Sequence, residues 1–102
     1  MTGTGIGTRI KELRTEKELA MDALVKEMRV KYGVEKMDKS MLSRWERGEN
    51  EPSLEYAKYL AMYFNVSLDY LIGLTEDRTP SATLARLSAY YNAMRKLMEE
   101  DK

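Results

Sequence analysis

Four side chains that can donate hydrogen bonds lie close together in the stretch "MDKSMLSRWERGENEPS", which runs from Met37 to Ser53. They are Lys39, Ser40, Ser43 and Arg44. Ammonium, hydroxyl and guanidinium groups are the types that reach phosphate oxygens and base edges in nucleic-acid complexes. The alternative is an ordinary solvated helix face. For these four residues alone, the solvated face is the simpler interpretation.

The apolar residues of the same stretch indicate which way this polar group faces. Leu42 and Trp45 are three residues apart, and Met41 lies four residues before Trp45. In a helix all three would face the core, which leaves the polar group on the outward side. Asp38 suits an N-cap and Gly48 suits the position that ends a helix. A helix of ordinary diameter fits the DNA major groove, which is about 12 Å wide.

Hydrophobic periodicity predicts an all-α chain, because apolar residues recur at helical spacing and no segment alternates as a strand would. Besides the helix described above, helices are expected at residues 6–17, 21–32, 54–64, 68–72 and 81–100. Thr4 or Thr8 could cap the first of these helices, and Gly33 would end the second.

The sequence indicates a five-helix domain followed by one separate helix. We expect a flexible N-terminal arm at residues 1–5, the domain at 6–74, a polar linker at 75–80 and a C-terminal amphipathic helix at 81–102. Apolar residues at alternating spacings of three and four make the last helix a candidate for dimerisation, with packing against its own domain as the alternative. These residues are Leu84, Leu87, Tyr91, Met94 and Met98.

Composition excludes several kinds of site. The sequence contains no Cys and no His, so it lacks disulfides, thiolate metal sites and the commonest general base. Its carboxylates and serines are scattered over helices, and we therefore expect neither an enzyme nor a cofactor or metal. No apolar run approaches the roughly 20 residues of a membrane span, so a cytoplasmic protein without a membrane partner is expected. The net charge is zero, which alone does not favour a nucleic-acid partner.

Two segments in this order carry a family resemblance: "GTRIKELRTEKELAMDAL" and "KSMLSRWERGENEPSLEYAKYLAMYFNVSLDYLIG". They resemble the helix-turn-helix DNA-binding domains of phage repressors, Cro proteins and Xre-type regulators. The resemblance covers residues 6–74, about two thirds of the chain. It implies a five-helix, lambda-repressor-like fold that binds DNA through one recognition helix.

Carried over residue by residue, the recognition helix of this family corresponds to Lys39 through Glu46. The resemblance implies that Lys39, Ser40, Ser43 and Arg44 read bases or nearby phosphates, and that Arg47 and Asn50 hold the DNA backbone. Leu42 matches the buried aliphatic residue of the recognition helix, and Trp45 faces the core beside it. Arg14 and Glu46 match a structural ion pair that ties the first helix to the end of the recognition helix.

Two departures from the family pattern affect the expected site. Met21 stands where family members usually have a Gln that reaches DNA. A core or staple role is the simpler interpretation for it, with apolar contact to a thymine methyl group as the alternative. The segment "RVKYGVEKMDK" lengthens the second helix and the turn after it, as in some phage repressors of Gram-positive hosts. This lengthening is expected to bring Arg29, Lys31 and Lys36 close to the recognition helix as candidate phosphate contacts, with solvated surface as the alternative.

The carboxylates of "ENE", Glu49 and Glu51, directly follow the proposed site. They would repel DNA unless they point away from it, so they predict weaker binding than a basic relative would have.

The expected function is that of a sequence-specific transcriptional regulator, a phage or prophage-type repressor that occupies a double-stranded DNA operator as a homodimer. Two alternatives stay open. One is an antitoxin-like regulator of a toxin–antitoxin operon, and the other is a protein-interaction module of the same fold that does not bind DNA. An antirepressor or a toxin would then be a further protein partner.

Overall fold

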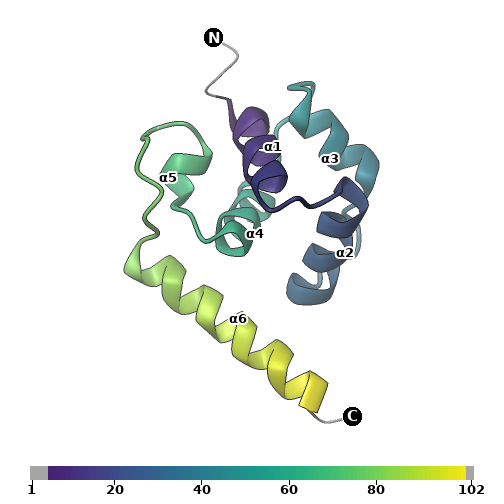
Figure 1. The fold of residues 1–102 in the computed structure, drawn as a ribbon, viewed down its shortest axis with the longest axis vertical. Helices are drawn as coiled ribbons and strands as arrows, with labels where there is room; N and C mark the ends of the chain where they lie inside the picture. Colours follow the sequence, from purple (N-terminus) through teal and green to yellow (C-terminus); the bar gives the residue numbers. More distant parts are fainter. Residues whose placement is uncertain (1–4, 101–102) are drawn as a thin grey trace.

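The computed structural model describes residues 5–100, which contain six helices joined by turns and loops (Figure 1). They are α1 (Ile6–Glu16), α2 (Met21–Tyr32), α3 (Lys39–Glu46), α4 (Leu54–Phe64), α5 (Leu68–Leu71) and α6 (Ala82–Glu100). No strand occurs among the described residues. The predicted all-α fold, a five-helix domain followed by a C-terminal helix, is confirmed.

The helix ends follow from short polar side chains and from residues that tolerate positive φ. Asp38 Oδ1 accepts a hydrogen bond from the amide of Met41 (2.8 Å) and so caps α3. Gly33 ends α2 at φ 70°, in the left-handed region that glycine adopts without a steric penalty. The N-cap of α1 is Gly5, and Thr8 lies inside the helix, so the prediction of Thr8 as cap is wrong.

The N-terminal arm predicted at residues 1–5 lies outside the described residues except for Gly5, and so does the other candidate cap, Thr4. None of the helices in the described part of the chain is long and apolar enough to cross a membrane.

Side chains from α1 to α5 meet in one hydrophobic core. The largest fully buried side chains are Ile10, Leu24, Met28, Met37, Leu42, Leu60, Met62 and Leu71. Of these, Met37 lies in the turn between α2 and α3, and its carbonyl oxygen accepts a hydrogen bond from Arg29 Nε (2.8 Å). The unusually long turn is therefore anchored to the core immediately before α3 begins.

Residues 75–80 connect α5 to α6 and are hydrogen-bonded to the domain along their length. The guanidinium of Arg9 donates to the carbonyl oxygens of Tyr70 (3.0 Å) and Thr75 (2.9 Å). Arg78 makes a two-pronged ion pair with Glu16, which lowers the pKa of that carboxyl. The polar composition that predicts a linker thus includes a side chain that bonds to α1.

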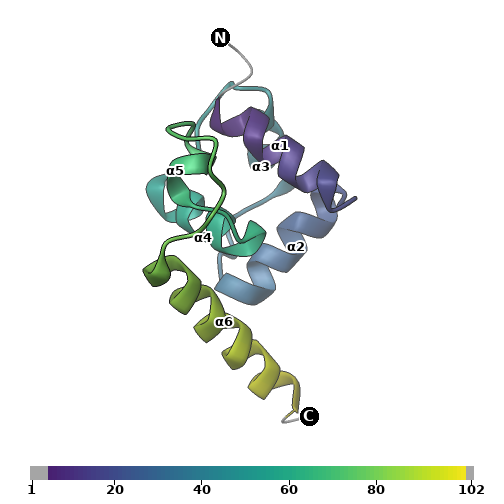
Figure 2. The ribbon, with the colours of Figure 1, turned by 60° about the vertical axis from the view of Figure 1, so that its left-hand side comes forward.

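The C-terminal helix α6 packs across α2 and α4, at the opposite end of the molecule from the loop between α3 and α4 (Figures 1 and 2). Leu84 is buried, and the ring of Tyr91 meets the rings of Tyr32 and Tyr59 edge-on at centroid distances of 5.2 and 6.0 Å. Arg95 pairs with Glu27 of α2 (3.1 Å).

Two of the predicted dimerisation residues, Leu84 and Tyr91, are therefore used for packing within the chain, because α6 turns that row toward its own domain. The apolar side chains that α6 leaves exposed are Leu87, Tyr90, Met94, Leu97 and Met98.

Candidate nucleic-acid interface

Helix α3 lies at the surface with its apolar side against the core. Leu42 is fully buried and Trp45 is 4% exposed, with the indole 5.3 Å from the ring of Tyr56. On the other side Lys39 and Ser40 are exposed, and Ser43 and Arg44 are half-buried. The burial of Leu42 and Trp45 thus fixes which side of α3 meets solvent.

Two hydrogen-bonded pairs of side chains lie along α3, each between residues four apart. Arg44 donates to Ser40 Oγ (2.8 Å), and Arg47 donates to Ser43 Oγ. With the Asn50 amide oriented to donate to the carbonyl of Glu49, its side-chain oxygen accepts from Arg44 Nε (3.3 Å). These bonds hold the two guanidinium groups along the outer side of α3, which reduces the rotamer freedom that they would lose on binding a ligand.

Helix α1 fixes the position of α3. Arg14 makes a two-pronged ion pair with Glu46 (2.7 and 2.8 Å) and donates a third bond to the carbonyl oxygen of Leu19 (2.9 Å). The hydrogen bond to Glu46 raises the pKa of Arg14. A Cβ atom added to Gly7 would lie 1.9 Å from the carbonyl oxygen of Trp45, so glycine permits a very close approach of the two helices.

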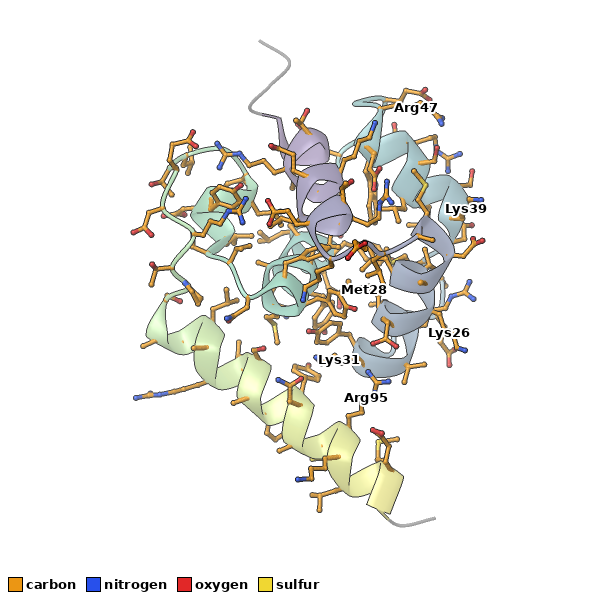
Figure 3. All side chains as sticks on the ribbon, viewed as in Figure 1. Lys26, Met28, Lys31, Lys39, Arg47 and Arg95 are labelled. Atoms are coloured by element: carbon orange, nitrogen blue, oxygen red, sulfur yellow. The ribbon has the colours of Figure 1, made fainter. Side chains whose placement is uncertain are left out.

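The cations of the lengthened segment before α3 lie in different places. Lys36 is exposed in the turn, and Arg29 is exposed although its Nε bonds to Met37. Lys31 instead lies beside Arg95 near α6, away from Lys39 and Arg47 (Figure 3). Its ammonium is 5.5 Å from the ring centroid of Tyr63.

The predicted position of Lys31 beside the recognition helix is therefore wrong, because α2 turns this residue toward α4 and α6. Partial burial, followed by the nearby charge of Arg95, lowers the pKa of the Lys31 ammonium.

Carboxylates lie beside the cations at both ends of α3. Glu49 does not point away from the site: its Oε2 accepts from Arg47 Nε at 2.6 Å, and this bond lowers the pKa of Glu49. Asp22, in the first turn of α2, lies 3.9 Å from Lys39 Nζ. The sequence does not predict that Asp22 lies beside Lys39. An acidic residue in the first turn of a helix is common because it interacts favourably with the helix dipole.

The outer side of α3 can therefore present hydroxyl, guanidinium and ammonium donors together to an anionic surface. Hydrogen-bond donors of these types match phosphate oxygens and the acceptors of guanine in the major groove. The four side chains predicted as base-reading candidates share this surface, and Arg47 and Asn50 extend it into the loop after α3.

Comparisons with known proteins match this arrangement. Residues 10–71 match the profile of a family described as helix-turn-helix. The chain is 30% identical over 82 residues to an uncharacterized HTH-type transcriptional regulator, YobD, of Bacillus subtilis, covering 80% of this chain and 67% of that protein. It is 29% identical over 86 residues to the HTH-type transcriptional activator BcrR of Enterococcus faecalis, covering 82% of this chain and 39% of that protein. No solved structure matches the chain significantly.

Proposed function

Because the chain belongs to the helix-turn-helix family of transcriptional regulators, we propose that it binds an operator in double-stranded DNA through the outer side of α3. The observation that carries this proposal is the group of hydrogen-bond donors on that side, opposite the buried Leu42 and Trp45. A helix in this setting can enter the major groove while its flanking residues hold the backbone.

The proposed roles differ along the helix. Ser40, Ser43 and Arg44 are the candidates for reading bases, and Lys39, at the start of the helix, is a candidate for a base or a nearby phosphate. An arginine such as Arg44 can bond to both acceptors of a guanine, which is the commonest specific contact in the major groove. Arg47, Asn50, Lys36 and Arg29 are the candidates for phosphate contacts, since they lie in the loop after α3, in the turn before it or at the end of α2.

We further propose that the regulator is a repressor of phage or prophage type that works by occupying its operator. The support is the resemblance of "KYGVEKMDKSML" to repressors with a lengthened second helix, and occupation requires no chemistry beyond binding. Similarity to a protein named a transcriptional activator makes activation the second candidate. A reporter gene under a promoter, with the operator placed upstream of the promoter or overlapping it, distinguishes repression from activation.

A homodimer is the proposed binding form, with a second copy of this chain on the exposed side of α6. Leu87, Tyr90, Met94 and Leu97 follow spacings of three, four and three, which is the seam of a two-helix coiled coil. Such a seam is self-complementary and therefore suits a two-fold interface. Dimeric helix-turn-helix proteins bind two half-sites about 34 Å, or a multiple of this, apart.

Selection of bound sequences from random duplex DNA tests the function. Titration with salt then distinguishes base contacts from phosphate contacts. We expect Arg44→Ala to lower affinity for the selected duplex by about 1–3 kcal/mol and to relax preference at particular base pairs. Arg47→Ala should weaken all duplexes alike and reduce the salt slope by about 1.

Lys96→Ala is the matched control for these variants. Lys96 is an exposed cation of α6, distant from α3, so its removal changes the net charge equally without touching the proposed site. Failure of every duplex to bind the wild-type chain at low salt would overturn the proposal. A uniform loss for Arg44→Ala would move that residue from base reading to backbone contact.

A further inference from the structure

The cations at the two ends of α3 are already paired with carboxylates in the unbound protein. Lys39, the first residue of the helix, lies 3.9 Å from Asp22, and Arg47, which caps its end, is bonded to Glu49 at 2.6 Å. Figure 3 shows Lys39 and Arg47 near opposite ends of α3. All four side chains are more than half exposed, so a DNA phosphate could approach either pair.

The cation in the middle of α3 has different partners. The hydrogen bonds of Arg44 go to the neutral oxygens of Ser40 and Asn50. Binding to these oxygens orients the guanidinium, which feels the charge of Glu49 without being bonded to it. The outer side of α3 thus combines a central cation bonded to neutral oxygens with a carboxylate-paired cation at each end.

The location of each carboxylate brings it into competition with phosphate. Asp22 lies in the first turn of α2, where the helix dipole favours an anion, and the N-cap residue Ala20 supplies no side-chain hydrogen bond. Glu49 directly follows Gly48, and its amide donates to the carbonyl of Arg44 (2.9 Å), so the backbone of the loop is held against the helix end. Both carboxylates therefore occupy positions beside cations that a DNA backbone would otherwise neutralise.

We propose that Asp22 and Glu49 compete with DNA phosphates for Lys39 and Arg47 and thereby hold down the affinity of this protein for all duplex DNA. This inference rests on the proposed function. The carboxylates weaken contacts with the DNA backbone, which every sequence offers equally. They do not weaken the base contacts of Arg44 and the serines. Only a duplex that supplies those base contacts then retains the protein at physiological salt, because backbone contacts alone are too weak.

The balance of energies permits this exchange. An exposed ion pair contributes little to stability, so a phosphate can displace the carboxylate without unfolding the region. The displaced carboxylate still repels the phosphates around it, and this repulsion lowers affinity on every sequence. The zero net charge of the whole chain fits the same design, since no excess of positive charge elsewhere offsets the two carboxylates by long-range attraction.

Fluorescence anisotropy with the full chain tests the proposal, using the selected duplex and one unrelated duplex over a salt series. We expect Glu49→Gln and Asp22→Asn each to tighten binding about two- to five-fold at low salt, as the loss of an exposed ion pair allows. The factor should be the same for both duplexes. The salt slope should steepen by up to about 1 for each variant, because one more phosphate contact releases counterions.

Glu99→Gln is the matched control. It makes the same change in net charge at an exposed position near the C-terminal end of α6, at the far end of the molecule from the loop after α3 (Figure 1). This variant should change the affinity and the salt slope much less than Glu49→Gln or Asp22→Asn does, because salt screens charges that lie far from the bound DNA. Thermal melting followed by circular dichroism verifies that each variant is folded.

Two results would overturn the inference while the proposed function stands. One is that Glu49→Gln and Asp22→Asn behave as the control does. The other is that Glu49→Gln weakens binding to the selected duplex alone. Glu49 would then be a base-reading residue that accepts a hydrogen bond from the amino group of a cytosine. Absence of binding by the wild-type chain to either duplex at low salt would overturn both the inference and the proposed function.

Discussion

At the scale of single residues, Gly7 sets how closely α1 approaches α3. No side chain stands between the backbone at Gly7 and the carbonyl oxygen of Trp45. Arg14 then reaches Glu46 from the same helix and holds the end of α3. The direction of the proposed DNA-binding surface therefore depends on one glycine and one ion pair, neither of which belongs to that surface.

We expect Gly7→Ala to lower the free energy of unfolding by about 1–3 kcal/mol, the usual cost of forcing an extra methyl group into a packed site. Alanine favours a helix interior over glycine, so any loss must come from the clash with the backbone of Trp45. Urea denaturation followed by circular dichroism measures the change.

Gly5→Ala is the control, because a Cβ atom there would meet nothing within 4 Å. The result that contradicts the packing of α1 on α3 is a Gly7→Ala variant as stable as the wild-type protein or more so.

Some residue roles can be predicted from the sequence and others cannot, for a physical reason. Burial of Leu42 and Trp45 follows from helical spacing, and the pairing of Arg14 with Glu46 follows from the family resemblance. Arg9 is 4% exposed and bonds to carbonyl oxygens more than 60 residues along the chain. No local pattern separates such a buried arginine from an ordinary surface cation, because its partners meet it only in the folded chain.

At the scale of helices, α6 has two rows of side chains with different uses. Leu84, Ser88, Tyr91 and Arg95 face the domain, whereas Leu87, Tyr90, Met94 and Leu97 are exposed. Both rows show helical spacing, so periodicity predicts the helix but cannot say which row packs on the domain. The contacts to Tyr32 and Tyr59 decide this, and they depend on where α2 and α4 lie.

The exposed row predicts the oligomeric state. We expect Met94→Glu combined with Leu97→Glu to convert the proposed dimer into a folded monomer, since both side chains are exposed. The melting temperature of the variant should not depend on protein concentration, because association no longer stabilises the folded chain. Analytical ultracentrifugation measures the association, and thermal melting measures the stability.

Leu84→Ala serves as the contrasting variant, because Leu84 is buried against the domain. It should cost about 2–5 kcal/mol of stability, as truncation of a buried leucine usually does. A wild-type chain that sediments as a monomer at all concentrations would contradict the proposed dimer, and so would a double variant that remains dimeric.

At the scale of the whole molecule, the two proposed surfaces lie at opposite ends. The chain extends 47 Å along its longest axis, with the loop after α3 near one end and the C-terminal part of α6 at the other (Figures 1 and 2). A partner on the exposed side of α6 would therefore leave α3 accessible to DNA. This separation is a property of the folded chain that helix positions in the sequence do not determine.

The sequence predicts the helices and their order because periodicity and capping are local properties. It predicts less well how the end of α2 and the long turn after it are arranged. Lys31 and Arg29 are two residues apart in sequence, yet Lys31 faces α4 and α6 while Arg29 bonds to the turn before α3. Helical rotation separates them, and the anchoring of Met37 in the core determines how the turn closes.

Mapping of amide chemical shifts on the intact protein tests the central claim most directly. On addition of the selected duplex at low salt, we expect the largest changes at residues 39–50, with little change along α6. The contradicting result is a set of changes confined to α5 or α6 while the amides of α3 keep their positions, because DNA would then bind elsewhere than on the outer side of that helix.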